Sequence, residues 1–162
     1  MAWHWAEAFK KRSGGLMAHA VLCCALVTPA IARPAAINAV DISADRIVLQ
    51  FDGAIEKASA FMLDAPRRIA IDVPGARAAA APAPVGAFIT GMRQGQNTPT
   101  TARIVLDLAQ PAIVTGGGFA PDGRSLTLSV KPVSDDAFAQ SAKGTRIAFA
   151  ALPRSGASSI RI

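Results

Sequence analysis

The sequence contains few of the residues that metal centres and nucleophilic active sites use. Its 162 residues include two Cys, two His and no Tyr, and every Cys and His precedes residue 33. Thiol and imidazole groups are common metal ligands and the usual partners in Ser-His and Cys-His nucleophilic pairs. From residue 33 onward we therefore expect no such metal site, no such nucleophilic pair and no cofactor.

The acidic side chains after residue 32 form no catalytic pattern either. They occur singly at predicted turns and on outward strand faces, Asp72 among them, except for the adjacent Asp135 and Asp136. We expect them to be solvated or to cap turns. Gly116–Gly118 precedes no helix pattern and is therefore not a phosphate-binding motif, so we predict a flexible or bulged turn there. The chain is not expected to be an enzyme by itself.

Residues 1–32 have the pattern of a secretory signal peptide. A basic stretch at Lys10–Arg12 precedes an apolar stretch at Leu16–Val27, which is shorter than the ~20 residues of a membrane-spanning helix. An A-x-A motif ends at Ala32, so the predicted cleavage lies between Ala32 and Arg33. We expect a periplasmic protein with no membrane span after cleavage; an uncleaved anchor or a buried helix is the alternative.

The charge that remains after cleavage does not indicate nucleic-acid binding. The excess of basic over acidic residues is +6 for the whole sequence and falls to +4 without residues 1–32. The remaining Arg residues are dispersed, and export separates the protein from nucleic acid. About 130 residues suffice for one domain with a sizeable core, which would have to fold without disulfides.

One passage of the chain occurs twice. Arg46–Phe51 (RIVLQF) reappears 57 positions later as Arg103–Leu108 (RIVLDL), and Ile69–Val73 is matched at the same offset by Leu126–Val130. Apolar side chains alternate with others in all four runs, as in strands with one buried face. Neither half can bury its apolar face alone. We therefore predict an all-β sandwich of two similar small β-sheets, built from an internal repeat of about 57 residues.

Turns connect the repeated runs. Asp64–Pro66 and Pro121–Gly123 contain residues that favour a turn between adjacent strands. Phe61 and Phe119, which precede these turns, are 58 positions apart, and we align them through one compensating gap.

The predicted organisation has four parts. A lead-in at 33–38 follows the signal peptide, the sandwich domain covers 39–133, and a linker-like tail covers 134–162. Within the domain, an Ala/Pro tract at 78–84 is a stiff connector, and 88–97 is a strand and loop that leads into the second copy. Within the tail, the alternating run at 146–150 could add one strand.

The order of these motifs resembles that of the AMIN domain. The chain has RIVLQF at 46–51, DAPRRIAIDVPGA at 64–76, GMRQGQ at 91–96 and ARIVLDL at 102–108. The resemblance covers about residues 39–133 and implies a β-sandwich of two similar sheets. AMIN domains stand at the N-terminus of many periplasmic N-acetylmuramoyl-L-alanine amidases and also occur in type IV pilus secretins. The resemblance implies a cell-envelope targeting module that binds peptidoglycan, or envelope or divisome proteins.

The catalytic domain of those amidases has no counterpart in the sequence. Its zinc ligands are His and Glu, whereas Glu56 is the only Glu after residue 32 and no His follows it. The resemblance thus implies a non-catalytic front part, and zinc is expected only in a downstream amidase domain. The alternative is a protein-interaction module of a type IV pilus or secretin assembly, in which a free sheet edge accepts a partner strand.

Candidate ligand-binding residues are polar side chains on outward strand faces and in the connecting loop. Arg makes two parallel charge-assisted bonds to carboxylates, such as those of muramyl groups and stem peptides, and Gln matches sugar hydroxyls. No Trp or Tyr follows residue 32, which argues against aromatic stacking on sugars. The candidates are Arg46, Arg68, Arg93, Gln96 and Arg103.

Arg46 and Arg103 are equivalent in the two copies, and we place them on the outward faces of opposite sheets. Within the first half Asp72 is available to Arg46, whereas Arg103 faces the Ser/Thr strand with only Asp107 nearby. We therefore predict that Arg103 is the less internally satisfied of the two and the better candidate for ligand contact. Replacing it with Ala is then expected to weaken envelope retention and to leave thermal stability nearly unchanged, within about 0.5 kcal/mol.

Overall fold

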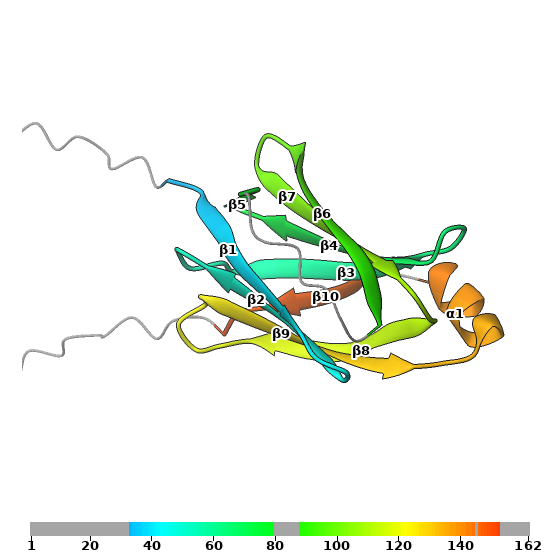
Figure 1. Cartoon of the computed structure of the whole chain (residues 1–162). Coiled ribbons are helices and arrows are strands. Elements are labelled where there is room, and N and C mark those ends of the chain that lie inside the picture. Colours follow the sequence, from blue (N-terminus) through cyan, green and yellow to red (C-terminus); the bar gives the residue numbers. More distant parts are fainter. Residues whose placement is uncertain (1–32, 80–87, 145, 153–162) are drawn as a thin grey trace, which may run out of the picture. The chain divides into compact units, whose positions relative to one another are not determined.

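The chain folds into two five-stranded β-sheets that pack face to face. The computed structural model describes residues 33–79, 88–144 and 146–152 (Figure 1). The first sheet has the order β5-β1-β2-β9-β8 and the second has β10-β3-β4-β7-β6. All pairs are antiparallel except β1 with β5. The predicted all-β sandwich is confirmed.

The strands of the first sheet are β1 (Ala35–Ile42), β2 (Arg46–Phe51), β5 (Ala76–Arg77), β8 (Ala112–Phe119) and β9 (Ser125–Pro132). Those of the second sheet are β3 (Lys57–Leu63), β4 (Arg68–Pro74), β6 (Ile89–Thr98), β7 (Thr101–Leu108) and β10 (Ile147–Ala150). One helix, α1 (Asp135–Ala142), lies between β9 and β10 in the chain.

The two sequence repeats are interleaved between the sheets. The equivalent strands β2 and β7 lie in different sheets, and so do β4 and β9. Because β2 pairs with β9, Arg46 lies opposite Ser129; because β4 pairs with β7, Asp72 lies opposite Arg103. The placement of the two Arg on opposite sheets is confirmed. The expectation that Asp72 is available to Arg46 and that Arg103 faces the Ser/Thr strand is wrong. Alternation defines the buried face of a strand and not its neighbour in the sheet.

The apolar faces of both sheets form one core. Burying a large aliphatic side chain stabilises the fold by about 1.5–3 kcal/mol, so these positions dominate stability. The repeated strands contribute side chains with no exposed surface: Ile47, Leu49, Ile69, Ile71, Val73, Ile104, Leu106, Leu126 and Leu128. The predicted core faces are thus confirmed.

The register corrects the alignment of Phe61 with Phe119. Phe61 lies opposite Ala70, on the outer side of the second sheet, whereas Phe119 lies opposite Leu126 and packs against the core. Gly118, opposite Thr127, is therefore the structural counterpart of Phe61. No gap is needed at this position.

The segment Gly116–Gly118 belongs to strand β8 rather than to a turn. The strand has a bulge between Val114 and Gly116. A Cβ at Gly117 would lie 2.4 Å from the carbonyl oxygen of Thr127, so only glycine fits there. The predicted turn is thus a bulged strand, and glycine is needed at Gly117 because of close backbone packing.

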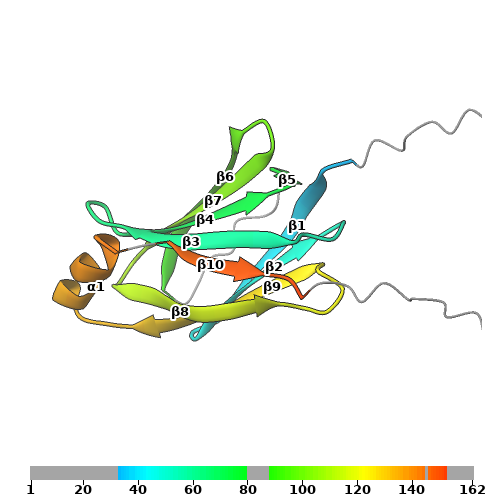
Figure 2. The same cartoon turned by 180° about the vertical axis from the view of Figure 1, so that it is seen from behind.

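Helix α1 (Asp135–Ala142) and strand β10 (Ile147–Ala150) follow Ser134, so the prediction of a linker-like tail is wrong for these two elements. The Ser134 Oγ accepts a hydrogen bond from the Ala137 amide at 3.3 Å, which caps α1, and Phe138 of this helix is buried. β10 then pairs with β3 at the edge of the second sheet, as Figure 2 shows. The predicted additional strand at 146–150 is confirmed.

The predicted boundaries are only partly within the described residues. β1 begins at Ala35, so the sandwich includes most of the predicted lead-in. The signal peptide up to Ala32, residues 80–84 of the Ala/Pro tract and residues 153–162 of the tail lie outside the described residues. Those expectations stay predictions.

Candidate functional site

The outer side of the second sheet carries a connected set of charged side chains, here called the arginine face. The strand register aligns outward residues in rows across four strands, and directly opposed Cβ atoms are about 4.5–5.5 Å apart. One row is Ser59, Asp72, Arg103 and Gly95, and the next is Phe61, Ala70, Val105 and Arg93. A third row adds Leu63, Arg68, Asp107 and Gly91, and Arg146 precedes β10 at the sheet edge.

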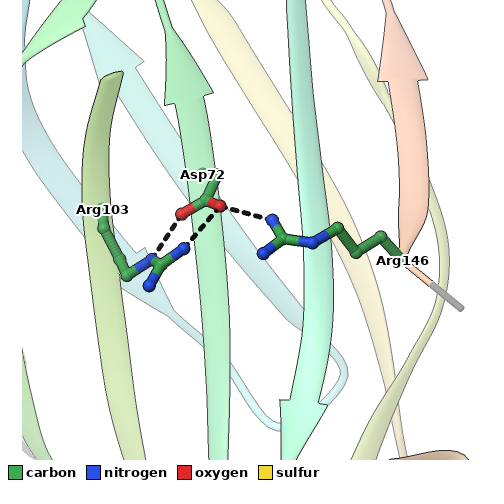
Figure 3. Close-up of polar contacts among 3 residues, drawn as sticks. All are labelled: Asp72, Arg103 and Arg146. Atoms are coloured by element: carbon green, nitrogen blue, oxygen red, sulfur yellow. Dashed lines mark hydrogen bonds and ion pairs between the residues drawn. The ribbon is translucent and has the colours of Figure 1, made fainter. Parts of the chain in front are cut away.

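Asp72 holds two arginines at the centre of this face. Arg103 donates from Nε and Nη2 to the two carboxylate oxygens at 2.6 and 2.8 Å. Arg146 reaches across β3 and donates from Nη1 to Oδ2 (Figure 3). Both guanidinium groups lie over the Phe61 ring, 5.3 and 4.0 Å from its centroid. Asp72 itself is only 6% exposed.

These contacts lower the pKa of Asp72. The hydrogen bonds from Arg103 favour the ionised carboxylate, burial opposes ionisation, and the hydrogen bond and charge of Arg146 favour it again. The hydrogen bond to Asp72 also raises the pKa of Arg103 above its ordinary value. Asp72 and Arg103 are therefore charged at neutral pH, and the Asp72 carboxylate fixes the orientation of both guanidinium groups.

An open pocket of about 280 Å³ lies beside this cluster, over β6 and β7. At Gly95, opposite Arg103, the row has no side chain, and nothing lies within 4 Å of a Cβ built there. The backbone of β6 is thus open between charged side chains. The lining residues are Arg68, Arg93, Gln94, Gly95, Gln96, Asn97, Arg103 and Val105.

Two of the lining arginines are only weakly engaged within the protein. Arg93 donates from Nη2 to Asp107 at 2.8 Å, but its side chain is 62% exposed. Exposed ion pairs contribute about 0–1 kcal/mol, so Arg93 can exchange its partner for a ligand at small loss. Arg68 donates from Nε to the Pro66 carbonyl at 3.2 Å and has no carboxylate partner among the described residues.

The structure brings together four of the five candidate residues. Arg68, Arg93, Gln96 and Arg103 all line the pocket. The Gln96 amide also donates to the Ala76 carbonyl at 3.2 Å and accepts from the Ala78 amide at 3.1 Å, so it ties β6 to the segment that contains β5.

Arg46 is separate from this group. It lies on the outer side of the first sheet, and its described partner is the adjacent Asp45 at 3.3 Å, in an exposed pair. The prediction that Arg103 is the less internally satisfied arginine is therefore wrong. Asp72 lies opposite Arg103, whereas Arg46 lies opposite Ser129.

Sequence reasoning missed Asp72 and Arg146 as members of the site. Asp72 was expected to be solvated, but it is buried. Its position inside the apolar run IAIDV was a usable signal, since a carboxylate in a buried strand requires a cationic partner. Arg146 gave a weaker signal, because it precedes a run of only four strand residues.

The outer side of the first sheet, here called the serine face, has a different composition. It presents Ser125, Thr127 and Ser129 from β9, with Gly116 and Gly118 beside them on β8. Its charged residues are dispersed: Arg46, Asp41 and Lys131. Asp41 accepts a hydrogen bond from Gln50 at 3.2 Å.

A second hollow is larger but lacks a charged cluster. It has a volume of about 640 Å³ and lies between Glu56 and Lys57, the turn at Pro121 and Gly123, and the end of β10. Among the residues that the structure describes, no three His, Cys, Asp or Glu side chains lie close enough together to hold a metal ion. No helix in this part of the chain has the length and apolar character needed to cross a membrane.

Comparison with known proteins identifies the family. The family model of the AMIN domain matches residues 36–137, which is more than half of the chain and extends from the second residue of β1 to beyond the end of β9. No curated protein matched the sequence. The AMIN domain is a non-catalytic module, which agrees with the lack of a catalytic pattern after residue 32. The chain belongs to the AMIN domain family.

Proposed function

We propose that the chain is a periplasmic targeting module that binds peptidoglycan through its arginine face. The observation that carries this proposal is the gathering of four arginines (Arg68, Arg93, Arg103, Arg146) around two carboxylates on one side of the sandwich. The excess positive charge suits the carboxylates of peptidoglycan stem peptides. Guanidinium groups bind planar carboxylates through two parallel hydrogen bonds.

The periplasmic part of the proposal is supported by the family and by the sequence. AMIN domains are modules of the periplasmic type. Residues 1–32 carry the basic stretch, apolar stretch and A-x-A motif of a secretory signal. Mass spectrometry of the exported protein is expected to find a chain that begins at Arg33, and a chain that begins at Met1 would contradict export with cleavage.

Sedimentation with purified peptidoglycan sacculi tests the binding. The protein is expected to appear in the pellet at low salt and to be released progressively as salt rises, because exposed charges are screened over about 10 Å at 0.1 M. A neutral insoluble polysaccharide serves as the control for trapping. Retention that is absent, or equal at low and high salt, would contradict the proposal.

The proposal extends to an attached enzyme, an N-acetylmuramoyl-L-alanine amidase that this module would place on the cell wall. Its support is the family resemblance, since many such amidases begin with an AMIN domain. Sequencing the reading frame downstream of Ile162 tests it. A His and Glu zinc-ligand set is expected there, and a secretin sequence instead would favour the second candidate.

The second candidate is a protein-interaction module of a pilus or secretin assembly. It is favoured by an unequal edge: β3 is covered by β10, whereas its counterpart β8 pairs with β9 and with no other strand that the structure describes. A free edge can accept a partner strand through backbone hydrogen bonds. Co-sedimentation of the chain with a purified secretin pore is the test, and no binding would exclude this role.

A further inference from the structure

The pocket at Gly95 has a geometry that selects one kind of ligand. Arg103 lies directly across from Gly95, and Arg93 lies two residues before it on β6. Arg103 uses Nε and Nη2 for Asp72. A guanidinium group has five N–H donors, so the Nη1 donors of Arg103 and one on Nη2 are left for a ligand.

Arg103, one of the arginines that line this pocket, is already fixed in place. Two hydrogen bonds to Asp72 and the contact with Phe61 hold its guanidinium group, and its side chain is only 30% exposed. A ligand therefore does not have to order this side chain, which is a main entropic loss in binding. Arg93 supplies the second guanidinium group once its ion pair with Asp107 is replaced by a contact with the ligand.

The size and lining of the pocket argue against a whole sugar unit as the occupant. Its volume of about 280 Å³ lies at the lower limit of the ~300–1,000 Å³ of small-molecule sites. The guanidinium groups of Arg103 and Arg146 lie over the ring of Phe61, so this aromatic face is not free to stack on a sugar. A single small anionic group fits both observations.

We propose that this pocket binds a single carboxylate group of peptidoglycan, held by Arg93 and Arg103 over the open backbone at Gly95. The inference rests on the proposed function and assigns its ligand chemistry. The carboxylate can come from a stem peptide or from the lactyl group of peptide-free glycan, and the two sources share the same planar, bidentate geometry.

The test changes the protein and the ligand separately. One variant fills the pocket with a side chain, and one probe lacks the charged carboxylate. Gly95→Leu adds a side chain where nothing lies within 4 Å, in a strand whose backbone angles suit any residue. Gly118→Leu is the matched control on the serine face, where the surroundings are equally open. The probes are a soluble muramyl dipeptide with a free carboxylate, the same compound as its carboxamide, and N-acetylmuramic acid, each titrated into the full chain and followed by NMR.

The wild-type chain and Gly118→Leu are expected to bind muramyl dipeptide equally, and Gly95→Leu to bind it at least about tenfold more weakly. A similar loss is expected for the carboxamide with the wild-type chain, because an amide carries no charge and cannot accept two parallel charge-assisted hydrogen bonds. Tighter binding of N-acetylmuramic acid than of the dipeptide would assign the lactyl group as the source. Arg93→Gln provides a second variant and is also expected to bind weakly.

Equal binding by Gly95→Leu, or equal binding of the carboxamide, would overturn the assignment of the pocket. Sedimentation with sacculi distinguishes a wrong assignment of the pocket from a failure of the proposed function. If the wild-type chain and Gly95→Leu both sediment in a salt-dependent way, the targeting role stands and the pocket is not the site. If the wild-type chain does not sediment, the targeting role itself fails.

Discussion

The arginine face and the serine face come from the same repeated sequence and share an arginine at one equivalent outward position, yet they differ in the charges around it. Arg103 on one face corresponds to Arg46 on the other, and Asp72 corresponds to Ser129. The register also places Asp41 on the serine face at the position that Arg93 occupies on the arginine face. The core positions, in contrast, are apolar in both copies.

The comparison shows how one exchange changes the role of an equivalent residue. Arg103 has a carboxylate across the sheet and becomes a fixed, half-buried donor, whereas Arg46 has a hydroxyl there and stays exposed. Phe61 adds a surface for the guanidinium groups, and its counterpart Gly118 offers none. The repeat therefore preserves the sandwich, while the outward residues make one face suited to anions.

The largest expected effect comes from removing the carboxylate that separates the two faces. Asp72→Ala leaves Arg103 and Arg146 without their anion, and we expect a loss of about 2 kcal/mol in the free energy of unfolding. This is less than the ~3–5 kcal/mol for a fully buried pair, because both arginines can turn toward solvent. Urea unfolding measures it. Ser129→Ala, at the equivalent position, is expected to change stability by less than about 0.5 kcal/mol.

The two equivalent arginines provide the next largest contrast. Arg103→Ala removes the bidentate partner of the buried Asp72, so we expect a loss of roughly 1–2 kcal/mol. Arg46→Ala removes an exposed pair with Asp45 and is expected to cost less than about 0.5 kcal/mol. Thermal or urea unfolding of both variants compares them directly. Equal losses would mean that the cross-strand carboxylate is not what distinguishes the faces.

Acid is expected to weaken the arginine face through Asp72. Because the folded-state pKa of Asp72 is below its ordinary value of 3.8, its stabilisation is complete above that value and is lost as pH falls through the folded-state pKa. The stability difference between the wild-type chain and Asp72→Asn should therefore shrink as the pH falls from about 5 toward 2. Urea unfolding across this pH range measures it, and a difference independent of pH would contradict the ion-pair account.

The smallest expected effect on stability comes from introducing a carboxylate on the serine face, opposite Arg46. Ser129→Asp places a carboxylate opposite Arg46, and opposed charges across a sheet contribute about 0.2–1 kcal/mol. We expect a gain of a few tenths of a kcal/mol, since no Phe covers the pair and it stays exposed. A double-mutant cycle with Arg46→Ala isolates the coupling, and zero coupling would show that the opposed position alone does not create the pair.

Much of the fold was predictable because strand periodicity is a local property. The alternation in Arg46–Phe51 and its repeat at Arg103–Leu108 predicted the strands, their buried faces and the sandwich. The exchange of strands between halves was not predictable, because it depends on long-range register that no local pattern records. For this reason Asp72 was assigned to Arg46, whereas the register places Asp72 opposite Arg103.

The site was predictable in part for the same reason. Outward faces were assigned correctly for Arg68 and Arg103, whereas Arg93 was expected in the connecting loop and lies in strand β6. Asp72 was assigned to solvent because its neighbours across the sheet were unknown. Helix α1 buries Phe138 and presents few other apolar residues, so its periodic signal is weak. Its start had a local signal in Ser134 followed by Asp135 and Asp136, since Ser caps helices and acids favour the first turn.

The central claim is that the arginine face, and not positive charge in general, holds the protein on the cell wall. Sedimentation with sacculi of two variants with equal charge loss tests it: Arg68→Gln with Arg93→Gln on the arginine face, and Arg46→Gln with Lys131→Gln on the serine face. We expect the first variant to lose most of its low-salt retention and the second to sediment like the wild-type chain. Equal loss of retention by both variants would contradict the claim.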